Sequence, residues 1–262
     1  MAGTMVYRRQ ARAADAPDLE PFLVSMRAAQ EKLDNQSFNH VAGHHGRPGW
    51  YCWHHQQSRR SPVQARLFLP WHRAYLWNLE QVLQDQDERA ALPWWDWTED
   101  RAIPDAYSRA TVDGGSNPLR RYRIQLPATA TRPAVRRYST RSPGASPWGR
   151  LPTRADVDAL LDDSDFASFS DRLQSHHDGV HVWVGGDMSD PTFAAFDPVF
   201  FAHHCMIDRI WYLWQVRWGI DRIPPALLDL ALAPFGKTVR DVLDVQALGY
   251  EYAASSVAIP IP

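Results

Sequence analysis

The most constraining feature of this sequence is the placement of its histidines within apolar stretches. The chain has 262 residues and eleven histidines, which fall into three clusters at 40–72, 176–181 and 203–204. Two adjacent histidines interrupt the otherwise almost wholly apolar run FDPVFFAHHCMIDRIWYLW, residues 196–214. Burying an imidazole without a polar partner costs free energy, and a metal ion shared by several histidines removes that cost. The pattern therefore predicts a metal site.

Helical spacing predicts which histidines face the same way. His177 and His181 are four residues apart, so on a helix both point to one side and can bind one ion. The spacing leaves His203 and His204 undecided, because each has apolar neighbours one turn away.

Two further histidines lie on apolar helical faces. His72 is on the stripe of a helix expected to begin near Pro70, and His45 shares a face with Phe38 and Val41. Imidazole ligands suit zinc, copper, iron and nickel. The sequence has neither CxxC nor HExxH, which argues against a zinc ribbon and the common zinc protease. Two sets of three histidines, holding two metal ions that face each other, fit better.

Composition narrows the class of protein. The formal charge of −2 gives no electrostatic case for nucleic acid or an anionic membrane as partner. Two cysteines are too few for a disulfide scaffold. No apolar stretch is long enough to span a membrane, and the N-terminus lacks the apolar run of a secretory signal. A cytoplasmic protein is expected, or one from which a signal has been removed.

The chain reads as mainly α, with a four-helix-bundle core, long irregular loops and few short strands. Residues 101–153 are rich in proline and arginine and are expected to lie over the core as an irregular segment. The glycine pair in VGGDMSDPTF suggests a flexible loop. The helical regions are predicted at residues 17–45, 70–90, 154–184 (as two helices) and 197–217.

Three motifs resemble the copper signatures of the tyrosinase family, which includes tyrosinases, catechol oxidases and molluscan haemocyanins. They are FLPWHRAYLWNLE (68–80), HDGVHVWVGG (177–186) and DPVFFAHHCMID (197–208). They occur in the family's order, and the resemblance extends from about residue 6 to residue 252. It implies one copper domain over residues 1–262, whose helix bundle encloses a binuclear type 3 copper site. Because only ten residues follow YEY (250–252), no C-terminal shielding domain is expected. The resemblance also implies that YRR (7–9) packs against YEY (250–252).

The resemblance implies six histidine ligands for two copper ions. They are His45, His54 and His72 for the first copper, and His177, His181 and His204 for the second. His203 then becomes a core or supporting residue. Asp208, one turn beyond His204, is expected to orient a ligand ring.

The middle ligand of the first copper departs from the family pattern, because residues 60–67 contain no histidine. His54 is favoured over His55, since CWH at 52–54 resembles the cysteine-x-histidine of members that carry a thioether bond. The alternative is that Cys52 is a buried thiol.

The implied activity is oxidation of o-diphenols to o-quinones, with O2 as co-substrate and small phenols as substrates. Alternatives are an o-aminophenol oxidase and a haemocyanin-like O2 carrier. In tyrosinases a glutamate and the residue after the first histidine of the second copper hold a water; these positions here are Gln174 and Asp178. An amide accepts protons poorly, so monophenol hydroxylation is expected to be weak or substrate-dependent.

Further roles are left open. A bulky residue over the second copper is expected to be Phe200, Phe201 or Met188, or these side chains are plain core. A separate copper-delivery chain is a candidate partner, although no motif identifies it.

Overall fold

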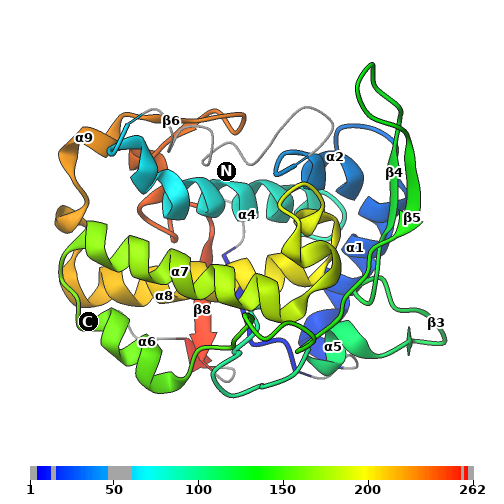
Figure 1. Ribbon diagram of the computed structural model, residues 1–262, viewed down its shortest axis with the longest axis horizontal. Coiled ribbons are helices and arrows are strands. Elements are labelled where there is room, and N and C mark those ends of the chain that lie inside the picture. The colour runs from blue at the N-terminus through cyan, green and yellow to red at the C-terminus, as the bar shows by residue number, and fades with distance from the viewer. Residues whose placement is uncertain (1–4, 13–15, 47–60, 255–256, 259–262) are drawn as a thin grey trace.

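The computed structural model describes residues 5–12, 16–46, 61–254 and 257–258. Its core is formed by four helices: α1 (Glu20–Glu31), α4 (Phe68–Gln84), α7 (Phe166–Val184) and α8 (Val199–Trp218). Helix α4 packs against the other three, and α7 and α8 run alongside each other below it in Figure 1. The predicted mainly α fold with a four-helix core is confirmed.

Local sequence signals place the ends of the two helices that carry the motif histidines. At the start of α7, the Asp165 side chain accepts a hydrogen bond from the backbone N–H of Ser168. Helix α7 ends at Gly185 and α8 ends at Gly219, both with positive φ. Helix α8 is buried over most of its length, which explains its nearly continuous apolar sequence.

The N-terminal helical region is divided into two helices, although the sequence predicted one helical region over residues 17–45. A turn after Glu31 separates α1 from α2 (Phe38–Gly43). The Asp34 carboxylate accepts from the backbone N–H of Gln36, and Ser37 caps α2 by accepting from the N–H of His40. These side chains offer the backbone an alternative to continuing the helix. Helix α2 is thereby free to turn and present His45 to the core.

The segment over residues 101–153 covers the bundle, as predicted, but it contains two antiparallel hairpins. Strands β2 (Thr111–Val112) and β3 (Gly115–Ser116) form one, and β4 (Arg123–Leu126) and β5 (Val135–Tyr138) form the other. The β4–β5 hairpin stands at the right edge of the molecule in Figure 1, beside α1.

The N-terminal and C-terminal segments pair with each other, and β8 passes behind α7 and α8 in Figure 1. Strand β1 (Val6–Arg8) runs parallel to β8 (Tyr250–Ala254), which also pairs with β9 (Val257–Ala258). The Arg8 guanidinium lies 3.5 Å from the centre of the Tyr250 ring. The expected packing of YRR against YEY is therefore observed.

The other elements are short connections. They are α5 (Asp105–Ser108), α6 (Arg154–Leu161), α9 (Pro225–Leu228), β6 (Ala231–Leu232), β7 (Lys237–Thr238), and the 3₁₀ turns η1 (Pro17–Leu19), η2 (Gln64–Leu67), η3 (Gly186–Ser189), η4 (Ala194–Phe196), η5 (Ile220–Arg222) and η6 (Arg240–Val242). Within the described residues, no helix has the length and apolarity needed to cross a bilayer.

The segment after α7, residues 186–196, is held in place by close contacts, although the glycine pair had suggested a flexible loop. We call it the clamped segment. It forms η3 and η4, and Asp187 within η3 is buried. Gly186 has a φ of 57°, and a Cβ there would lie 2.2 Å from the Thr140 carbonyl oxygen. The glycines therefore allow close packing of the backbone rather than mobility.

Candidate metal centre

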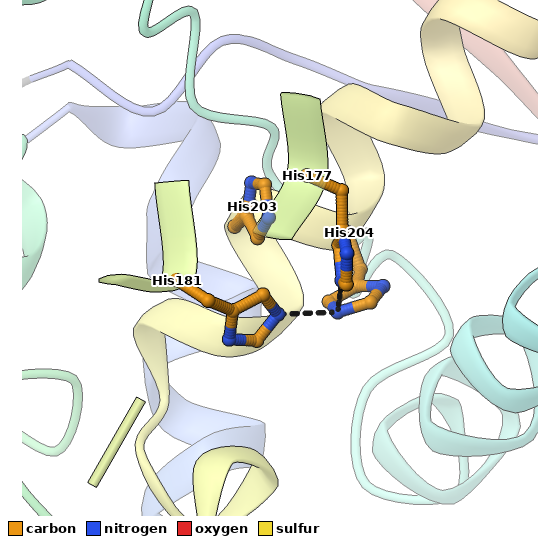
Figure 2. Close-up of side chains that lie close together, drawn as sticks. All are labelled: His177, His181, His203 and His204. Atoms are coloured by element: carbon orange, nitrogen blue, oxygen red, sulfur yellow. Dashed lines mark hydrogen bonds between the residues drawn. The ribbon is translucent and has the colours of Figure 1, made fainter. Parts of the chain in front are cut away.

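Three imidazoles converge between α7 and α8. The Nε2 atom of His204 lies 3.1 Å from Nε2 of His177 and 3.2 Å from Nε2 of His181. Dashed lines mark these two contacts in Figure 2. With His203 they form a buried group in which one ring nitrogen from each lies within 4.8 Å of the others. The four-residue spacing on α7 thus does bring two rings to a common point, as helical geometry predicts.

The Nδ1 atoms of several predicted ligand histidines lie against oxygen atoms. Four histidines share an arrangement in which Nδ1 faces an oxygen that can only accept a hydrogen bond. The pairs are His177 with Asp178 Oδ1 (2.9 Å), His181 with the Met188 carbonyl (2.7 Å), His45 with the Pro191 carbonyl (2.9 Å) and His72 with the Phe68 carbonyl (2.9 Å). Nδ1 must therefore carry the proton, which leaves the Nε2 lone pair for a metal.

This tautomer pattern tests whether the residues fit a metal ion. With Nδ1 protonated, Nε2 of His177 and of His181 both present lone pairs toward Nε2 of His204, which can donate a hydrogen bond to one of them at most. Lone pairs that face each other in a buried site repel unless a cation lies among them. The donor set and its geometry therefore fit a metal that prefers imidazole, such as copper.

Burial keeps the α8 histidines neutral. Desolvation lowers the pKa of His204 well below its usual value, and the neighbouring His72 and His177 lower it further. The pKa of His203 is lowered in the same way. Neutral imidazole is the form that binds metal.

Two of the predicted ligands of the first copper lie close to this group. His72 is on α4, and His45 follows the end of α2. The His72 ring stacks on the His204 ring with centroids 4.3 Å apart, and the His45 ring lies 5.9 Å from that of His72. Both are buried. His54, His55 and Cys52 lie outside the described residues, so the third predicted ligand and the thioether stay predictions.

His203 occupies a supporting place behind the cluster. The Trp97 indole N–H donates to Nδ1 of His203 at 3.3 Å, and the His203 ring stacks on that of His177 at 5.1 Å. His203 thus packs against a predicted ligand, while the Nε2 atom of His204 faces the α7 pair.

The two residues predicted to hold a water differ in their exposure and in whether they line the cavity. Asp178 is exposed, lines the cavity and binds Nδ1 of His177. Gln174 lies one turn earlier on α7, is half-buried and is not among the residues that line the cavity. The structure therefore brings Asp178 to the site and leaves Gln174 beside it.

The expectation that Asp208 orients a ligand ring is wrong. Its carboxylate binds Arg73 at 2.6 Å, Arg8 at 3.2 Å and the hydroxyls of Tyr250 and Tyr252. Burial alone would raise the pKa of Asp208, but the two guanidiniums hold it below its usual value. Asp208 faces the N-terminal strand because α8 turns it away from the histidines, and it anchors the helix instead.

An open cavity of about 240 Å³ leads to the histidines. Met188 lines it together with His45, His177 and His181. Phe200 is buried, and its ring lies 4.0 Å from that of His204 and 4.8 Å from that of His45. Of the bulky residues expected here, Phe200 packs within the histidine cluster and Met188 borders the cavity.

Sequence reasoning missed the acceptors that orient the rings of the predicted ligands. Two are backbone carbonyls, of Met188 and Pro191, in the clamped segment after α7. Any residue has a carbonyl, so side-chain identity carried no signal for them. The buried Asp187 carboxylate fixes this segment by accepting from Arg137 and from the N–H of Thr140.

A four-helix core whose inward imidazoles need a shared cation defines a histidine-ligated metalloprotein. Residues 35–217 match the family model described as the common central domain of tyrosinase. A tyrosinase of Streptomyces lincolnensis is 37% identical over 191 residues, which are 64% of this chain and 69% of the relative. The chain belongs to the tyrosinase family.

Solved structures show the same fold. The tyrosinase of Burkholderia thailandensis superposes with a TM-score of 0.73 at 21% identity, over 97% of this chain and 75% of that one. An octopus haemocyanin functional unit gives a TM-score of 0.72 at 22% identity, over 97% and 71%. The protein is a copper oxidoreductase of the polyphenol oxidase class, with two copper ions as cofactor and O2 as co-substrate.

Proposed function

We propose that this chain oxidises o-diphenols to o-quinones with O2, and that it hydroxylates monophenols only weakly. The observation that carries the proposal is the convergence of Nε2 of His177, His181 and His204 beside an open cavity. Two diphenols give up four electrons and four protons, and one O2 is reduced to two waters. Bound copper would supply the electron transfer between phenol and O2.

The proposed ligands follow from this geometry and from the family motifs. His177, His181 and His204 hold the second copper, and His45 and His72 hold the first. His54 is the proposed third ligand of the first copper, with Cys52 linked to it by a thioether. Intact mass before and after thiol alkylation tests that link, because two alkylated cysteines would contradict it.

The chain's own residues orient the ligands and receive protons. Carbonyls and one carboxylate fix the Nδ1 atoms, so the rings do not have to reorganise during the reaction. Asp178 lines the cavity, and only its Oδ1 is bonded among the described contacts. Its other oxygen is placed to take a phenol proton.

The weak monophenol activity is inferred from the surroundings of Asp178. Gln174 carries an amide and does not line the cavity, so Asp178 would have no second carboxylate to help it accept a proton. The rate with a matched pair, catechol and phenol, measures this directly. Rapid phenol turnover without a catechol-primed lag would contradict it.

Copper content measured alongside O2 uptake tests the main proposal. We expect His204→Ala and His177→Ala to lose copper and to slow catechol oxidation by at least about a hundredfold. His176→Ala is a matched control, because His176 neighbours His177 but contacts Arg150 instead of the cluster. It should keep both copper content and rate.

Two outcomes separate the alternatives. Reversible O2 binding without catechol oxidation would favour a carrier, to which the haemocyanin fold similarity points. Faster turnover of o-aminophenol than of catechol would favour an aminophenol oxidase. The proposed copper-delivery chain is tested by loading the purified protein with copper salt alone; full loading would show that the chain needs no such partner.

A further inference from the structure

Positive charge is concentrated in one segment that the metal site does not use. Residues 119–141 contain seven arginines and no aspartate or glutamate. The chain's formal charge of −2 therefore divides into +7 for this segment and −9 for all other residues. Six of the seven arginines are exposed, so the charge is presented on the surface. A separation of this size creates a local field that attracts anions.

This segment borders a groove between the β4–β5 hairpin and α1, the two elements side by side at the right of Figure 1. The groove has a volume of about 580 Å³. Three arginines line it, from two places in the sequence: Arg27 on α1, and Arg121 and Arg123 around the start of β4. Glu31 is the only carboxylate among its described lining residues. We call this hollow the arginine groove.

The groove arginines lack carboxylate partners in the described part of the chain. Among the described residues, Arg27 donates to the Ser116 carbonyl alone, at 3.4 Å. Arg121 lies over the Tyr138 ring, 4.3 Å from its centre, and Arg123 makes no described ion pair or hydrogen bond. By contrast, Arg137 on the inner face of the hairpin is paired with Asp187. The arginines that face the groove are thus the ones available to a partner.

Apolar surface lies among these charges. Leu33 at the groove is 94% exposed, and Tyr138 is 47% exposed. The strand register places Arg123 opposite Tyr138, so a guanidinium and an aromatic ring share the outer face of the hairpin. Arginine and tyrosine are enriched in protein interfaces, where they combine polar and apolar contact.

We propose that the arginine groove binds an acidic segment of a partner polypeptide, with carboxylates on Arg27, Arg121 and Arg123 and an apolar side chain against Leu33 and Tyr138. Guanidinium groups bind carboxylates through paired hydrogen bonds. The mixture of charge and exposed apolar surface matches a polypeptide better than a nucleic acid.

The test uses fluorescence anisotropy with a labelled short peptide that carries glutamates around a central leucine pair, and its glutamine counterpart. The full chain should bind the glutamate peptide and not the glutamine peptide, more tightly at low than at physiological salt. Arg121→Gln with Arg123→Gln should weaken binding by roughly tenfold. Neither residue contacts the metal centre, so catechol oxidation should stay unchanged.

A matched control removes the same charge elsewhere. Arg154 and Arg172 are exposed and pair with Glu99 and Asp163, away from the groove. Arg154→Gln with Arg172→Gln should leave peptide binding intact, and an equal loss would overturn the proposal. Tighter binding of a single-stranded oligonucleotide than of the peptide would also overturn it. Concentration-dependent self-association that the groove variant abolishes, without peptide binding, would assign the groove to a second copy and overturn it too.

Discussion

At the scale of single residues, each histidine is defined by what its two ring nitrogens contact. The Nδ1 atoms of His177 and His181 are held by a carboxylate and a carbonyl, and their Nε2 atoms point to a common centre. His203, adjacent to His204 in sequence, instead accepts from Trp97. Adjacent histidines on one helix therefore make different contacts, because their rings leave the helix in different directions.

Asp178→Asn tests how that residue acts. Asparagine keeps an acceptor oxygen for His177 Nδ1 but removes the charge that makes the ring more basic, so we expect copper affinity to fall about tenfold. If Asp178 also takes the phenol proton, turnover of a monophenol should fall more than turnover of catechol. Metal titration and paired rates measure both effects. Unchanged affinity and an unchanged rate ratio would contradict both roles.

His44 provides a pH-dependent prediction. Burial, with help from nearby His40, lowers the pKa of His44 to about 4. An unfolded histidine takes up a proton near pH 6.5, and the folded one does not until the pH reaches about 4. Folding stability should therefore decrease as the pH falls through this window, by up to about 2 kcal/mol since the ring is partly exposed.

His44→Phe isolates this contribution. Phenylalanine can still pack against Phe235, whose ring lies 5.8 Å from that of His44, but it cannot be protonated. We would measure the free energy of unfolding in urea for the copper-free protein between about pH 4.5 and pH 7. As the pH falls, the value for the variant should rise relative to that of the wild type. A stability difference that is constant with pH would contradict the prediction.

At the scale of elements, the clamped segment after α7 connects the surface hairpin to the metal centre. Asp187 fixes η3 by binding Arg137 of β5, and the next residue, Met188, accepts the hydrogen bond from His181. Gly186 lets η3 approach Thr140 closely. The orientation of one predicted ligand thus depends on an ion pair outside the bundle.

Asp187→Asn should weaken this support. The amide keeps the size of the side chain but cannot form a charged pair with Arg137, so the Met188 carbonyl should move relative to His181. We expect copper affinity or catechol oxidation to fall by roughly tenfold to a hundredfold. Asp221→Asn, in an exposed turn, makes the same charge change and should have no effect. Full activity of Asp187→Asn together with an unchanged copper spectrum would refute the link.

At the scale of the whole molecule, a buried charged network connects the two ends of the described chain to the bundle. Arg8 on β1 binds Glu80 of α4 and Asp208 of α8, and Tyr252 on β8 donates to the same aspartate. These side chains are almost fully buried, so the charges are stabilised by one another, by Arg73 and by the backbone N–H of Leu92 instead of by water. The network keeps α4 and α8 in register, which places His72 against His204.

Asp208→Asn should destabilise the fold strongly. It leaves Arg73 without its carboxylate partner in a buried position, which costs about 3–5 kcal/mol. Denaturant unfolding of the copper-free protein measures the loss. Glu99→Gln, whose side chain forms an exposed pair with Arg154, should cost less than about 1 kcal/mol. Equal effects of the two substitutions would contradict the prediction.

Much of the fold and part of the centre could be predicted from local patterns. Apolar spacing indicated α4, α7 and α8, and the four-residue interval indicated that His177 and His181 face one way. The pairing of β1 with β8 followed from the family resemblance. The division of α1 from α2 did not emerge, because apolar spacing continued across a turn that Asp34 and Ser37 stabilise.

The sequence by itself determined which side of each helix is apolar, and so that several imidazoles would be buried together. Tertiary structure alone decided that Asp208 faces the arginines instead of a histidine, and that the Met188 and Pro191 carbonyls bind the rings of His181 and His45. The reason is physical. Periodicity is a property of one helix, whereas the rotation of helices against each other and the position of a distant backbone oxygen are set by packing between segments far apart in the chain.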